Sequence, residues 1–247
     1  MAFSLRWFVV PFILNLSCHA GSPAMAGKLT DAVKARDVAQ VRSLLAAGED
    51  VNEMVQGNYP LNVAALFGPA ELVGVLLDAE ADIEKPGRGG SRPLHNAAVM
   101  GHSDIVALLI RKGAVVDAKD RKGRTPLNYF TAMAKSDIET VKILLAAGAD
   151  PNTEDMDQWA PLNYTVRYSG NVELGRVLIA AGADINHRKD NGESPVGTAT
   201  FHMNYEFARM LILAGADVNQ VDNDGRTPLS YVKDVEMRQL LIEAGAQ

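Results

Sequence analysis

The chain has 247 residues, of which 47% are hydrophobic, and its formal net charge at pH 7 is -6. This hydrophobic fraction is enough for a continuous core, and the acidic balance argues against nucleic acid as a partner, because phosphate binding needs a cationic face. Cys18 is the single cysteine, which excludes an intramolecular disulfide framework.

The first 26 residues have the pattern of a secretory signal peptide. Arg6 precedes an apolar run from Trp7 to Leu16, and small residues follow as far as Ala24-Met25-Ala26. We predict cleavage after Ala26, which would leave a mature chain without cysteine and so suited to an oxidising compartment.

Two alternatives for this segment are weaker. An uncleaved membrane anchor needs about 20 apolar residues, and the run is shorter and contains Pro11 and Asn15. A lipoprotein would be acylated at Cys18, but the residue three positions before that cysteine is Asn15 rather than leucine. We therefore expect no membrane attachment after cleavage.

From residue 27 onward, two sequence markers recur in step. A Pro-Leu step or a close variant recurs at intervals of 33, 33, 35, 34 and 33 residues, at Pro60, Pro93, Pro126, Pro161, Pro195 and Pro228. An Ala-Gly-Ala-Asp motif or a relative of it ends each unit, at Gly48, Glu80, Gly113, Gly148, Gly182, Gly215 and Gly245. Two independent markers with one period indicate tandem structural repeats.

Each unit carries the signals of two helices. The proline is suited to the first turn of a short helix, and a second helix has apolar residues at helical spacing, as in the segment from Ile105 to Leu109. The element Pro93-Leu94-His95 within a repeat of about 33 residues resembles the ankyrin-repeat signature. The resemblance implies an all-α fold, an ankyrin-repeat solenoid of about seven helix-turn-helix units with short hairpin fingers.

After the signal peptide (1–26), residues 27–247 are predicted to form this single domain. Its units are an N-terminal cap, 27–56; repeats 57–89, 90–122, 123–157, 158–191 and 192–224; and a C-terminal cap, 225–247. Glu80 replaces the glycine that ends the second helix, which predicts a less clean end there. The fourth unit has two extra residues, around Ala134 to Thr140, and the fifth has one.

No catalytic or metal-binding set is found. No two histidines are three or four residues apart, and His95 is expected to brace a turn through hydrogen bonds. The glycine-rich segment 87–91 lacks the ending of a phosphate-binding loop and is expected to form a finger turn. Asp155 and Asp157 are expected to be solvated finger residues. We predict a non-enzymatic protein without metal or cofactor.

The resemblance implies a concave groove for protein partners, formed by finger tips and exposed positions of the first helices. By register, the sixth and seventh residues after each proline lie in this groove, together with finger residues. The predicted partner-binding residues are Phe67, Arg88, Val99, Met100, Arg121, Arg124, Met133, Trp159, Arg167, Tyr168, Arg188, Phe201 and His202. The apolar members are either an exposed binding stripe or ordinary core between repeats.

Export and the absence of chemistry favour a protein-binding scaffold in the bacterial periplasm, with a protein partner on the concave face and a monomeric free state. Known exported proteins of this family imply two roles: an immunity or inhibitor protein for a toxic periplasmic hydrolase, or a helper that protects or assembles an oxidative-stress enzyme such as a catalase. A third interpretation is an extracellular effector that binds a host protein.

Overall fold

The computed structural model describes residues 27–133 and 138–247. The predicted signal peptide and most of the insertion in the fourth unit, residues 134–137, lie outside the described residues. Within the described ranges, no helix is both long and apolar enough to cross a bilayer. The same ranges hold no group of three or more histidine, cysteine, aspartate or glutamate side chains able to hold a metal ion.

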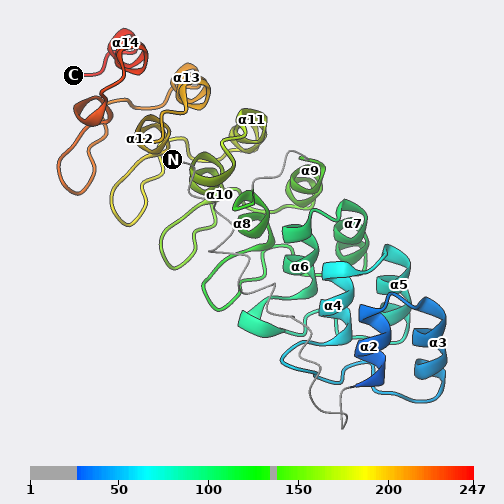
Figure 1. Cartoon of the computed structure of the whole chain (residues 1–247). Helices are drawn as coiled ribbons and strands as arrows, with labels where there is room; N and C mark the ends of the chain where they lie inside the picture. Colours follow the sequence, from blue (N-terminus) through cyan, green and yellow to red (C-terminus); the bar gives the residue numbers. More distant parts are fainter. Residues whose placement is uncertain (1–26, 134–137) are drawn as a thin grey trace.

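The helices form two parallel rows, and finger loops project beyond the inner row (Figure 1). The inner row contains α2 (Lys28–Lys34), α4 (Pro60–Phe67), α6 (Pro93–Met100), α8 (Pro126–Thr131), α10 (Pro161–Tyr164), α12 (Pro195–Phe201) and a 3-10 turn (Pro228–Tyr231). The outer row contains α3 (Val38–Ala46), α5 (Ala70–Asp78), α7 (Ser103–Arg111), α9 (Glu139–Ala146), α11 (Val172–Ala180), α13 (Tyr205–Leu213) and α14 (Val235–Glu243). The predicted helical solenoid is confirmed.

The inner helices begin as the sequence predicts. In α8, Pro126 occupies the first turn and the Thr125 hydroxyl accepts a hydrogen bond from the Asn128 N–H at 3.3 Å. The Asn128 side chain accepts in return from the Thr125 N–H at 3.0 Å. This reciprocal capping satisfies N–H groups that have no partner within the helix.

The outer helices end in a left-handed residue. After α7, Gly113 has φ of 93°, and the next residue, Ala114, donates its N–H to the Leu109 carbonyl at 3.0 Å. After α5, Glu80 adopts φ of 64°, and Ala81 makes the equivalent bond to Leu76 at 3.0 Å. The prediction of a less clean end at Glu80 is therefore wrong. The helix ends in the same way, and the consequence of having Glu80 in place of glycine is backbone strain, since a side chain disfavours a positive φ.

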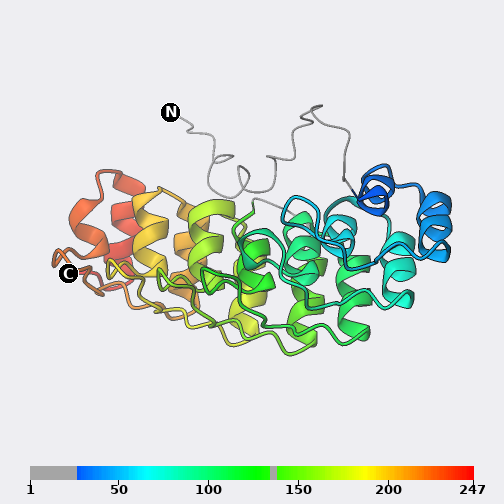
Figure 2. The ribbon, with the colours of Figure 1, turned by 90° about the horizontal axis from the view of Figure 1, so that it is seen from below.

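One apolar core extends along the array from Leu29 to Leu241, between the two rows. Figure 2 shows the units side by side in one elongated array. Small residues let neighbouring helices approach closely. In α11, a Cβ atom added to Gly175 would lie 2.6 Å from Phe207 Cζ in α13. The core therefore depends on contacts between successive units, as in other solenoids.

The extra residue of the fifth unit lies within its inner helix. From Pro161 to the left-handed Gly170 this helix contains one residue more than the segment from Pro93 to Gly101. The helix accommodates the insertion as a π-helical turn, Thr165–Ser169, in which the Gly170 N–H donates to the Thr165 carbonyl at 2.8 Å. Such turns often occur at functional sites.

Candidate functional site

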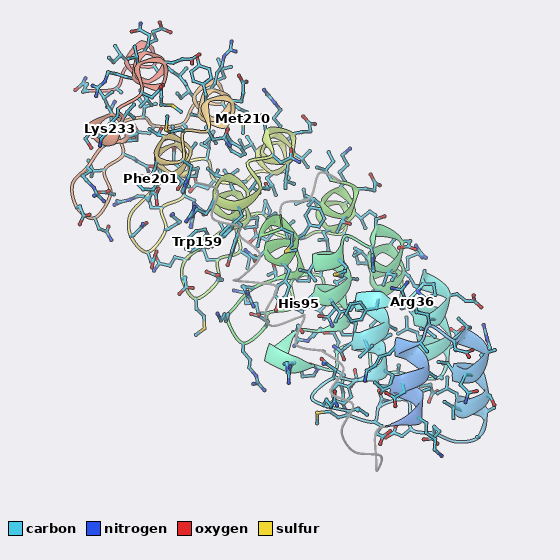
Figure 3. The ribbon with its side chains drawn as sticks, in the orientation of Figure 1. Arg36, His95, Trp159, Phe201, Met210 and Lys233 are labelled. Atoms are coloured by element: carbon cyan, nitrogen blue, oxygen red, sulfur yellow. The ribbon has the colours of Figure 1, made fainter. Side chains whose placement is uncertain are left out.

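We call the surface formed by the inner helices and the fingers the finger side. Figure 3 shows Trp159 and Phe201 on this side, whereas Met210 lies on the outer row. The predicted partner-binding residues separate into three groups here: a packed apolar cluster, finger cations, and a hollow between the fifth and sixth units.

The first group is largely buried. Leu66 and Val99 are only 5% and 1% exposed, and with Tyr129 they form a small cluster separate from the main core. The half-buried Phe67, Met100 and Met133 pack against this cluster. The prediction that Val99 is exposed is therefore wrong, because the apolar residues of neighbouring inner helices pack against one another here. In this part of the array, the stripe is mainly structural.

The second group consists of finger cations. Arg88, Arg121 and Arg188 are exposed, and the Arg188 Nε donates to the Gly192 carbonyl at 3.1 Å. Arg124 was expected to be a free cation at its finger, but it is not. Its guanidinium is bound to the buried Asp120 carboxylate at 2.8 Å, because that carboxylate needs a compensating charge. Arg124 therefore braces the finger.

Asp120 is the centre of this brace. Its carboxylate also accepts hydrogen bonds from the Tyr129 hydroxyl at 2.9 Å and from the N–H groups of Lys122 and Arg124 at 2.8 and 2.9 Å. Burial would raise the pKa of Asp120, but the hydrogen bonds and charge of Arg124 outweigh it and hold the pKa below the usual range. The third finger is thus tied to α8.

Asp155 has the same role in the next finger. It is 8% exposed, accepts N–H donors from Asp157 and Trp159 at 3.0 and 2.9 Å, and accepts the hydroxyl hydrogen of Tyr164. The expectation that Asp155 is solvated is wrong, because this carboxylate ties the finger to α10. Burial and this bond raise the pKa of Tyr164, so it acts as a donor and not as an acid at neutral pH.

The finger that leads into the sixth unit reverses the polarity of the brace. The position of Asp120 is taken by Lys189, and that of Arg124 by Glu193, with Nζ and Oε2 2.7 Å apart. Lys189 is 5% exposed, and its ammonium group lies 4.5 Å from the centroid of the Trp159 ring, within cation–π distance. Burial would raise the pKa of Glu193, but the hydrogen bond and charge of Lys189 lower it.

Aromatic rings stack beside this ion pair. The Trp159 ring lies 5.7 Å from the Tyr168 ring at an interplanar angle of 24°, and 5.2 Å from the Tyr164 ring. Trp159 comes from the finger and Tyr168 from the π-helical turn. Offset stacking of this kind adds about 0.5–1.5 kcal/mol to the burial of the rings. The π-helical turn is therefore held against the finger.

A hollow of about 360 Å³ opens next to this stack. It is lined by Trp159, Arg167, Lys189, Asn191, Glu193, Phe201, His202, Asp222 and Arg226. A second hollow, of about 400 Å³, shares Phe201 and is lined by Thr200, Met203, Val232, Lys233, Asp234 and Met237. Phe201 and Met203 are each 65% exposed. Here the predicted stripe is accessible.

The hollow brings together five predicted residues, namely Trp159, Arg167, Tyr168, Phe201 and His202, either in its lining or in the stack behind it. Burial, followed by the charge of Arg167, lowers the pKa of His202, which favours neutral imidazole at neutral pH. Both carboxylates in the lining, Glu193 and Asp222, have a lowered pKa, because hydrogen bonds and nearby cations outweigh their burial.

The roles of Lys189, Glu193, Asp222 and Arg226 were not predicted from the sequence. A signal for these roles was present in the sequence. The residues six and two positions before the proline carry opposite charges before Pro126, Pro195 and Pro228. His95 was predicted to brace a turn, and this is confirmed. Its Nδ1 accepts from the Arg92 N–H at 3.2 Å, and its Nε2 lies 3.0 Å from the Arg124 carbonyl oxygen.

Comparison with known proteins agrees with this architecture. The family model described as ankyrin repeats (3 copies) matches residues 29–120, 84–155, 109–189 and 162–247. The crystal structure of the ankyrin repeat domain of Bcl-3, described as a unique member of the IkappaB protein family, is similar with a TM-score of 0.78 and 22% sequence identity, covering 89% of this chain and 100% of that chain. No curated protein sequence matches. Ankyrin repeats are typically non-enzymatic modules that bind other proteins, and this chain belongs to the ankyrin-repeat family.

Proposed function

We propose that this protein is an exported, non-enzymatic scaffold that captures a protein partner on a concave finger side. The observation that carries the proposal is the exposed apolar surface at Phe201 and Met203, next to the two hollows. Exposed apolar groups next to charged and aromatic side chains are typical of interfaces. The brace at Lys189 and Glu193 supports the proposal because a fixed finger loses little entropy on binding.

The site of action that we propose is the periplasm, with an extracellular location as the alternative. The support is the signal-peptide pattern of residues 1–26. Fractionation of producing cells and mass spectrometry of the N-terminus test this. A chain that begins after Ala26 and is found in the periplasm would agree, whereas a cytosolic chain that retains residues 1–26 would refute export.

The partner role that we propose is inhibition of a toxic periplasmic hydrolase by covering its active-site opening. Protein captured from periplasm should be identified, purified and assayed with and without the scaffold. Loss of turnover at stoichiometric scaffold supports inhibition. Unchanged turnover refutes it, and protection of a catalase-type partner against peroxide would favour the helper role instead.

Two exposed apolar residues provide a matched test of the binding surface. Phe201→Ala should weaken the purified complex by about 30-fold, the effect expected for an interface hot spot. Leu213→Ala is the control, since Leu213 is 73% exposed but lies in the outer helix α13. Equal effects of the two variants on the dissociation constant would contradict binding on the finger side.

A further inference from the structure

The lining of the first hollow contains three cations, Arg167, Lys189 and Arg226, and two carboxylates, Glu193 and Asp222. Lys189 is paired with Glu193 at 2.7 Å, and Arg226 is paired with Asp222 at 2.9 Å and with Asp224 at 2.7 Å. Arg167 makes no ion pair with any residue in the described ranges 27–133 and 138–247. The lining therefore contains one half-buried guanidinium, that of Arg167, which forms no ion pair with a described residue.

The π-helical turn fixes the position of this guanidinium. Arg167 lies within the turn, and its Cζ is 5.6 Å from the centroid of the Tyr168 ring. Because Tyr168 stacks on Trp159, the turn is packed against the finger. The inserted residue thus presents Arg167 to the hollow on a constrained backbone. The charge of Arg167 also affects His202, because after burial it is the largest cause of the lowered pKa of that imidazole.

An apolar surface lies directly beside this charge. Phe201 contributes to both hollows, and the exposed Met203 lines only the second. A ligand with a carboxylate in the first hollow can therefore place an adjacent apolar group against Phe201. A basic ligand would put a second cation next to Arg167, which is unfavourable in a partly desolvated site.

We propose that these adjoining hollows bind an acidic peptide segment of a protein partner, with an Asp or Glu carboxylate on Arg167 and a neighbouring apolar side chain against Phe201. Guanidinium and carboxylate form paired, charge-assisted hydrogen bonds, which makes arginine suited to this recognition. The inference rests on the proposed function and specifies the chemistry of the segment that the finger side recognises.

The test uses the full chain with Trp7→Phe, so that Trp159 is the only tryptophan whether or not residues 1–26 are removed. A random peptide display library is selected on this protein. The strongest peptide is then synthesised, together with a version in which each acidic residue is replaced by its amide. Trp159 fluorescence measures both affinities. We expect selected peptides to carry an acidic residue beside a large apolar one, and the amide version to bind at least about tenfold more weakly.

Arg167→Glu should reduce affinity for the acidic peptide by more than about tenfold, since attraction becomes repulsion. Arg176→Glu, an exposed cation reversal on the outer helix α11, is the control and should leave affinity unchanged. Circular dichroism checks that each variant folds. If Arg167→Glu does not fold, Arg167→Gln replaces it in the affinity measurement. Raised salt should weaken wild-type binding.

Selection of peptides without acidic residues, failure to enrich any peptide, or equal affinity of wild type and the Arg167 variants would overturn this inference. The proposed function can survive that result. If Phe201→Ala still disrupts the purified partner complex while Arg167→Glu does not, the finger side binds a protein through other chemistry. If neither variant affects the complex, binding on the finger side fails as well.

Discussion

His95 makes the fold sensitive to acid in a way that can be measured. The side chain is fully buried, and its Nδ1 accepts a hydrogen bond from the Arg92 N–H. The Nε2 must therefore carry the proton that is donated to the Arg124 carbonyl oxygen, 3.0 Å away. Protonation would place a second N–H against the Arg92 N–H. Burial lowers the pKa of His95 to about 4 and outweighs the hydrogen bond to the Arg124 carbonyl and the charge of Asp120, which raise it. The charges of Arg92 and Arg124 add to the lowering.

The magnitude follows from proton linkage. An unfolded chain takes up the proton near pH 6.5, whereas the folded chain takes it up only near pH 4. The contribution of His95 to the unfolding free energy is therefore complete above pH 6.5, falls as the pH drops through this window, and is lost below it. At about 1.36 kcal/mol for each pKa unit, the full loss is about 3 kcal/mol, and most of it has occurred by pH 4.5.

The variant His95→Asn removes the titration while keeping both hydrogen bonds. Asn128 has the equivalent position in the next unit; its side chain accepts from the Thr125 N–H at 3.0 Å and donates to the Trp159 carbonyl at 3.3 Å. Urea unfolding at pH 7 and pH 4.5 gives the free energies of both proteins. The variant should gain about 2–3 kcal/mol relative to wild type at the lower pH.

The contributions of all other titrating groups to the pH dependence are the same in both proteins and cancel in the difference between their unfolding free energies. A difference between the two proteins that does not change with pH would refute the argument. An NMR titration of the His95 ring gives an independent check, since a midpoint near 6.5 would show that the folded protein does not disfavour the charged form.

Three further predictions concern stability, measured by urea unfolding. Glu80→Gly should stabilise by about 1 kcal/mol because Glu80 has φ of 64°, whereas Gly113→Ala, at φ of 93°, should destabilise by a similar amount; no gain at Glu80 would show that the strain is absent. Gly175→Ala should destabilise by about 1–3 kcal/mol, because its Cβ would lie 2.6 Å from Phe207 and 2.8 Å from Met210. Gly74→Ala in α5 has nothing within 4 Å and should stabilise by up to about 1 kcal/mol; similar effects at both glycines would contradict the packing argument. Tyr164→Phe should cost about 1–3 kcal/mol by removing the only side-chain donor to Asp155 Oδ2 in the described residues. Tyr129→Phe should cost less, since Asp120 Oδ2 keeps Arg124, and the reverse order would contradict these assignments.

The repeat, the helices and most of their ends can be predicted from the sequence alone. Proline at the first turn and a left-handed residue at Gly113 are local requirements of the backbone, so they can be recognised without knowing what packs nearby. The role of His95 could be predicted for the same reason, because its capping bond to Arg92 spans only three residues.

Which groove positions are accessible depends on packing between units and could not be predicted from the sequence. Val99 and Phe201 have the same register, six residues after Pro93 and Pro195. Yet Val99 is 1% exposed and Phe201 is 65% exposed, because burial depends on the side chains of the neighbouring units. Likewise, the finger position held by Arg124 is held by Trp159 in the next unit, and the sequence does not show that Arg124 faces a buried carboxylate while Trp159 stacks on Tyr168. Repeat period is encoded within each unit, whereas the recognition surface is created between units.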